Sequence, residues 1–99
     1  MLEISKQKDG SKMTIVLVGR IDSLTAKELE KSLAGEFDGM TEVIVDASEV
    51  SYVSSAGLRV LLAARKSVRG GATFAIENAN EEVRGIFEVT HLTELLNVK

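Results

Sequence analysis

The sequence contains no cysteine, no proline and no tryptophan. Without cysteine the chain can form neither a disulfide framework nor a thiolate metal site. Without proline, its turns must be made by glycine, asparagine, aspartate and serine. The amino-terminal segment MLEISKQKDG has no apolar signal-peptide region, and no apolar run is long enough to span a bilayer. We therefore expect no membrane association and a reducing, cytoplasmic location.

Aromatic and basic residues are also scarce. Aromatics make up 4% of the chain, and 12 basic against 15 acidic residues give a formal net charge of -3. Nucleic-acid binding usually requires a basic face, often with stacking rings, so we expect no nucleic-acid partner. The only histidine, His91, lies in the carboxyl-terminal segment, away from any serine that would need it as a base. We expect no enzymatic activity of its own, no metal site and no cofactor.

Apolar periodicity over the 99 residues predicts one α/β domain, residues 1–99, with the element order ββαβαβα. The Asp9-Gly10 pair predicts a hairpin over residues 1–19. Two further short apolar runs predict buried strands, one over residues 42–46 that ends at Asp46 and one over residues 72–76. Strands that alternate with helices predict a mixed, mostly parallel sheet with helices packed on it.

Three helices are predicted from their end signals. In the first, Thr25 and Glu28 have the spacing of a capping box, Leu24 and Leu29 that of a hydrophobic staple, and Gly35 the place of a helix stop. The second is expected from Ser55 to Arg69, with Gly70-Gly71 as its stop and an inner stripe that includes Leu58 and Leu61. Asn80 is expected to cap the third.

Polar residues follow two of the predicted strands. Asp22 comes after the second strand, and Asp46 closes the third, ahead of the helix that Ser54 and Ser55 open. Because ligands usually meet such sheets at the carboxyl ends of the strands, these side chains are candidates for one site. Alternatively, each is a turn or cap residue, although one cap needs only one of the two serines.

A helix amino terminus stabilises an anion through its free N–H groups and its dipole. A phosphoryl group on Ser55 would add about -1.5 to -2 charges to a chain that is already acidic. With Asp22 or Asp46 nearby, that charge would repel an acidic or closely packed partner. Ser55 is therefore a candidate switch, with the free hydroxyl compatible with binding and the phosphoserine not.

The segments GRIDSLTA (19–26) and VIVDASEVSYVSSAGLRVLL (43–62) resemble the STAS domain, and most closely the small stand-alone bacterial anti-sigma factor antagonists. The resemblance implies that the unphosphorylated protein binds an anti-sigma factor that is also a serine kinase, and so frees a sigma factor. It also implies that phosphorylation releases the antagonist and that a metal-dependent serine phosphatase resets it. ATP and magnesium would then belong to the kinase.

Aligned on Gly57 and Leu58, the phosphoacceptor of the family is Ser55, with Ser54 as second choice. Ser54 stands where the family often has aspartate, and the carboxyl-terminal strand and helix look shortened. The residues expected to bind the partner are Asp22, Ser23, Thr25, Asp46, Ser54, Ser55, Ala56, Gly57, Leu58, Arg59 and Ala63.

Two alternatives to this switch stay open. The chain could be a STAS module that senses a nucleotide or lipid at the same site, or a scaffold subunit of a stress-signalling assembly. Calorimetry against nucleotides would test the first, and molecular size would test the second, because a scaffold self-associates whereas an antagonist is expected to be a monomer.

Overall fold

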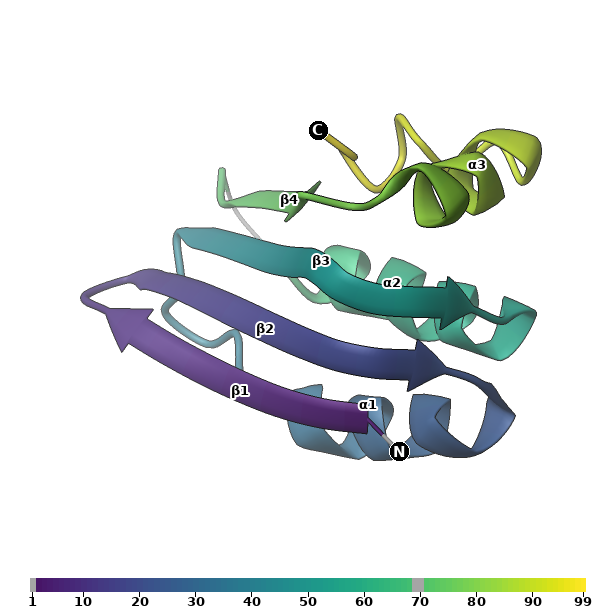
Figure 1. The fold of residues 1–99 in the computed structure, drawn as a ribbon. Helices are drawn as coiled ribbons and strands as arrows, with labels where there is room; N and C mark the ends of the chain where they lie inside the picture. The colour runs from purple at the N-terminus through teal and green to yellow at the C-terminus, as the bar shows by residue number, and fades with distance from the viewer. Residues whose placement is uncertain (1, 69–70) are drawn as a thin grey trace.

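The computed structural model describes residues 2–68 and 71–99, and within these ranges it has the predicted element order ββαβαβα (Figure 1). The strands are β1 (Leu2–Asp9), β2 (Lys12–Ile21), β3 (Glu42–Val53) and β4 (Thr73–Glu77). The helices are α1 (Ser23–Leu33), α2 (Ser55–Ser67) and α3 (Glu81–Val89).

The strands form one sheet in the order β1-β2-β3-β4. β1 and β2 are antiparallel and are joined at Gly10, whose φ of 63° is the left-handed conformation that the turn requires. β2, β3 and β4 are parallel to one another. The predicted hairpin and the mixed, mostly parallel sheet are therefore confirmed.

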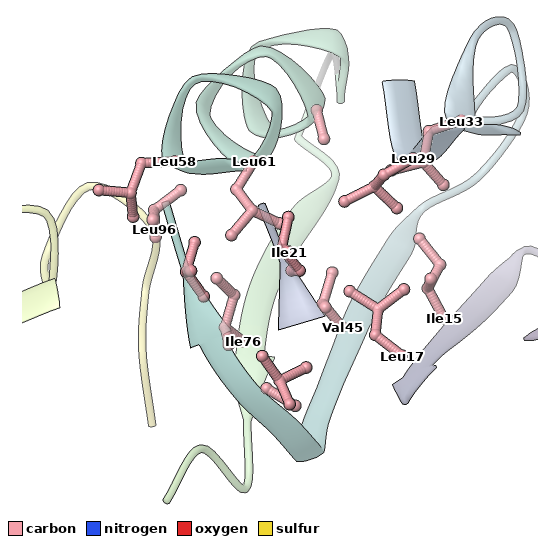
Figure 2. Packing of buried hydrophobic residues seen from close by; sticks show 14 of the residues in the cluster. Ile15, Leu17, Ile21, Leu29, Leu33, Val45, Leu58, Leu61, Ile76 and Leu96 are labelled. Carbon is pink, nitrogen blue, oxygen red and sulfur yellow. The ribbon is translucent and has the colours of Figure 1, made fainter. Parts of the chain in front are cut away.

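The core lies between one face of this sheet and helices α1 and α2. Alternate residues of β2 and β3 point into it, among them Met13, Ile15 and Val45, which are at most 1% exposed. Figure 2 shows Leu29 of α1 and Leu61 of α2 directed at these strands. The alternate residues of the strands and the helically spaced leucines thus pack into the same core.

The predicted start of the first helix is wrong in detail. The N-cap is Asp22, and Thr25 is the second member of its capping box rather than the cap itself. Leu24 is 74% exposed and therefore does not form the expected staple with Leu29. The predicted stop is confirmed, since the helix ends just before Gly35, which has a φ of 71°.

β3 is longer than predicted. It continues past Asp46 to Val53, with register shifts against β2 after Val16 and Gly19 that accommodate the polar stretch. α2 begins at Ser55 as expected and ends at Ser67, while the predicted contributions of Arg69 and Gly70 lie outside the described residues.

The third helix and the last segment complete the core. Asn80 caps α3 by accepting the N–H of Val83, as predicted. The last segment adds Leu96, which is 0% exposed, and a parallel bridge between Val98 and Ile76. The end of the chain is therefore packed onto β4, although it forms no further helix among the described residues.

Candidate functional site

The carboxyl ends of β2 and β3 lie side by side and bring two strand–helix junctions together. Ile21, the last residue of β2, pairs with Val53, the last residue of β3, and its carbonyl oxygen accepts the N–H of Ser54 at 2.8 Å. The first turns of α1 and α2 therefore start next to each other. We call residues 22–25 and 54–59 together the serine junction.

Asp22 organises the α1 side of the junction. Its Oδ1 accepts the N–H of Thr25 at 2.9 Å and that of Leu24 at 3.0 Å, while the Thr25 hydroxyl accepts the N–H of Asp22 at 2.8 Å. The N–H of Thr25 is the main cause that lowers the pKa of the Asp22 carboxyl, with smaller contributions from the Thr25 hydroxyl and the N–H of Leu24. Asp22 thus keeps its negative charge at the junction.

The two serines have different roles. Ser54 is the N-cap of α2, and its half-buried Oγ accepts the N–H of Gly57 at 3.1 Å. Ser55 is the first residue of the helix and is exposed, and no hydrogen bond of the described residues involves its hydroxyl. One serine is therefore occupied by the turn, and the other presents its oxygen to solvent.

Three of the predicted partner-binding residues support the junction from inside. Thr25 and Leu58 are 5% and 7% exposed, and Gly57 is buried. A Cβ on Gly57 would lie 2.6 Å from Ile21 Cγ2, which shows how closely α2 approaches the end of β2. These three positions hold Ser55 in place but offer little surface to another protein.

A groove between α1 and α2 adjoins the junction. It has a volume of about 250 Å³, and it is lined by Ser23, Ala26, Lys27, Glu30, Ala56, Arg59 and Val60. Ser23 and Arg59 are exposed along it, and Ala56 is half-buried. Ala63 lies one turn further along α2, beside a second hollow of about 130 Å³. The exposed members of the predicted set thus form one continuous surface with Ser55.

Asp46 does not belong to that surface. It pairs with Val16, five residues before the end of β2, so it lies about 16 Å along the sheet from the serine junction. Its Oδ1 accepts the N–H of Ser48 at 3.0 Å, and this bond is the main cause that lowers the pKa of the Asp46 carboxyl. The expectation that Asp46 would cluster with Asp22 and the serines is wrong, because β3 continues past it.

Sequence reasoning missed Leu24 as a surface residue of the junction. Its side chain is 74% exposed on the first turn of α1, where the Asp22 cap holds the backbone. The clue available in the sequence was the Asp22-x-x-Thr25 spacing, which also fits a capping box and would have turned Leu24 outward. The junction therefore combines a carboxylate, a free hydroxyl and an exposed apolar side chain.

Comparisons with known proteins identify the family of this chain. A family model described as Mlab, STAS domain matches residues 4–97. The chain belongs to the STAS domain family. The anti-sigma-B factor antagonist of Listeria monocytogenes is 32% identical to this STAS domain over 98 residues, which cover 95% of this chain and 84% of that protein.

Two solved structures share the fold. An anti-sigma factor antagonist from Mycobacterium paratuberculosis superposes with a TM-score of 0.90 at 20% identity, covering 99% of this chain and 85% of the other. The Bacillus cell fate determinant SpoIIAA in its phosphorylated form gives 0.73 at 14% identity, covering 98% and 91%. The predicted family and fold are thus confirmed.

The described residues contain neither a cluster of metal ligands nor a membrane-spanning helix. No three side chains of histidine, aspartate or glutamate converge there as metal ligands would. Within the same ranges, no helix combines the length and the apolar character that crossing a bilayer requires.

Proposed function

We propose that this STAS domain is a non-enzymatic, cytoplasmic anti-sigma factor antagonist that is switched by phosphorylation of Ser55. In its unphosphorylated form it binds an anti-sigma factor kinase through the serine junction and so frees a sigma factor. The observation that supports this assignment is that the two serines have different roles. Ser54 caps α2, while the Ser55 hydroxyl is exposed.

The chemistry is a phosphoryl transfer supplied by the partner. The Ser55 oxygen would attack the γ-phosphorus of ATP in the kinase, the bond to the β-γ bridging oxygen would break, ADP would leave, and the hydroxyl proton would pass to a base of the kinase. ATP and magnesium belong to that partner. A metal-dependent serine phosphatase would later hydrolyse the ester and restore the hydroxyl.

Two electrostatic effects would make the phosphorylated form a poor binder. The phosphate would add its charge to a junction that already holds the Asp22 carboxylate, whose charge is maintained by its cap hydrogen bonds. It would also lie one helical turn before Arg59, at the i, i+4 spacing that favours an ion pair within a helix. Arg59 would then be paired within the chain instead of with a carboxylate of the partner.

The groove supports a protein partner over a small ligand. Its volume of about 250 Å³ is below the usual range of roughly 300–1,000 Å³ for small-molecule pockets, and the charged side chains of Lys27, Glu30 and Arg59 line it. A nucleotide would find little enclosed space there. Saturable binding of a nucleotide in calorimetry, without any kinase present, would favour the sensor function instead.

The decisive experiment is phosphosite mapping by mass spectrometry after incubation with a purified anti-sigma factor kinase and ATP. We expect the label on Ser55, and no label in Ser55→Ala. The matched control is Ser11→Ala, because Ser11 is an exposed serine in the turn between β1 and β2, away from the serine junction. Label that persists in Ser55→Ala and disappears in Ser54→Ala would move the acceptor to Ser54.

Binding measurements complete the test. Ser55→Asp should bind the unmodified kinase at least tenfold more weakly than the wild type does, whereas Ser11→Asp, in the turn at the far end of β2, should bind almost normally. Gel filtration should give a monomer. Equal binding by Ser55→Asp and the wild type would refute the switch, and a large assembly would favour a scaffold.

A further inference from the structure

The face of the sheet opposite α1 and α2 is turned toward the viewer in Figure 1, and no helix of the described part of the chain crosses it in front of β1 or β2, while α3 contacts β3 through the bond from Asn80 Nδ2 to the Val50 carbonyl oxygen. Val16, Val18 and Ile44 point to this side, because their neighbours in the strands point into the core. They are half-buried and do not belong to the core cluster or to the residues packed against it. The face thus has apolar side chains at its centre and no layer above them.

Carboxylates surround these apolar residues. The strand register places Glu3 and Glu49 on either side of Val18, and Asp46 directly opposite Val16. Glu77 of β4 lies directly opposite Asp46. Of the described acidic residues, only Glu36 forms a salt bridge, and it lies outside this group. We call Glu3, Val16, Val18, Ile44, Asp46, Glu49 and Glu77 the acidic face.

The basic residues of β2 on the same sheet side lie at the two ends of that strand, and Lys99 lies next to Glu77, because Val98 bridges Ile76, although Lys99 forms no salt bridge with Glu77. Lys12 pairs with Glu42, and the guanidinium of Arg20 lies 4.7 Å from the centre of the Tyr52 ring. Neither residue is paired in register with Asp46 or Glu77, which face each other across neighbouring strands. Like charges in directly opposite positions destabilise a sheet, so this pair would be stabilised by a cation brought from outside.

The negative charge of the acidic face limits which partners could bind to it. A second copy of this chain would bring the same carboxylates against themselves, and a nucleic acid or an anionic membrane would be repelled. We propose that the acidic face is a second docking surface, distinct from the serine junction, for a basic segment of a partner protein that carries apolar side chains between its lysines or arginines. The apolar centre would bury its aliphatic side chains, and the carboxylates would pair with its cations.

The probe is a synthetic peptide of about ten residues that alternates lysine with valine. Titration of the 15N-labelled protein should shift the amide signals of β2 and β3 around Val16 and Ile44, and leave those of α1 unchanged. Fluorescence anisotropy with the labelled peptide should show affinity about tenfold weaker for the double variant Asp46→Asn/Glu77→Gln, as expected when two exposed ion pairs are lost.

Two matched variants distinguish docking of the peptide at the acidic face from general electrostatic attraction to the protein. Glu28→Gln/Glu30→Gln removes the same number of charges from α1, on the opposite side of the sheet, and should retain wild-type affinity. Val18→Thr keeps the side-chain shape and the strand preference but removes apolar surface, and it should weaken binding even in high salt. Equal losses in both charge variants, or amide shifts that map to the helices, would overturn the proposal.

Discussion

Gly57 is the position where a single methyl group should disturb the serine junction most. It lies in the first turn of α2 and is buried against the ends of β2 and β3. A Cβ built there would lie 2.6 Å from Ile21 Cγ2, 3.0 Å from Val53 Cγ1 and 3.2 Å from the Ile21 carbonyl oxygen. Two of these atoms are branched methyl groups close to the backbone and the third is backbone, so the helix itself must move.

The expected change in the free energy of unfolding follows from two opposing effects. Overpacking of this kind costs about 1–3 kcal/mol. The better helix propensity of alanine returns at most about 1 kcal/mol, and less in a first turn. Gly57→Ala should therefore lower the free energy of unfolding by about 1–2 kcal/mol, which corresponds to a fall in Tm of roughly 5–15 °C for a domain of this size.

Urea unfolding followed by circular dichroism measures this change, and Gly85→Ala is the matched control. Gly85 lies inside α3 with nothing within 4 Å of its virtual Cβ, so the same substitution should stabilise the protein by about 0.5–1 kcal/mol. Because α2 would shift on β2, Gly57→Ala should also slow phosphorylation of Ser55. If Gly57→Ala were as stable as the wild type, the close approach of helix and strand would not limit the packing, and the expected overpacking cost would be wrong.

Other variants test the cap, the acid response and the end of the chain. Ser54→Ala should cost about 1 kcal/mol in urea unfolding through loss of the N–H···Oγ bond to Gly57, and Ser54→Asp should restore most of it. Because hydrogen bonds hold the pKa values of Asp22 and Asp46 low in the folded state, their contribution to stability is present above about pH 4 and is lost as the pH falls through the lowered values. Urea midpoints between pH 7 and pH 2 should follow that course, and Asp46→Asn should flatten part of the decrease, whereas an unchanged slope would mean that Asp46 does not contribute. Leu96→Ala should cost about 2–5 kcal/mol by thermal unfolding because Leu96 is 0% exposed, and a cost below 1 kcal/mol would show that the last segment is not part of the core.

Local signals predicted most of the fold correctly. The turn at Gly10, the stop at Gly35 and the cap at Asn80 are recognised from a few neighbouring residues, and the structure confirms all three. The helical spacing of apolar residues likewise placed Leu58 and Leu61 on the buried side of α2. These features depend on contacts within one element or one turn, which is why a single sequence carries them.

The start of α1 shows where local signals become ambiguous. Asp22-x-x-Thr25 and Thr25-x-x-Glu28 have the same spacing, and either could form a capping box. The first is used because Ile21 still pairs with Val53, which fixes the end of β2 and leaves Asp22 as the first residue free to cap. Pairing with a strand far along the chain therefore selects which capping box forms. That capping box leaves the Leu24 side chain exposed.

Local sequence patterns were enough to predict the order of the elements, the class of the sheet and the position of two serines at the start of a helix. The tertiary structure decided which side chains share a surface. Pairing of residues 47–53 with the end of β2 moved Asp46 away from Asp22 onto the acidic face, and the bond from the Ser54 N–H to Ile21 made Ser54 the cap and left Ser55 exposed. Both outcomes depend on the register between strands, which no local pattern encodes because it is set by contacts between distant residues.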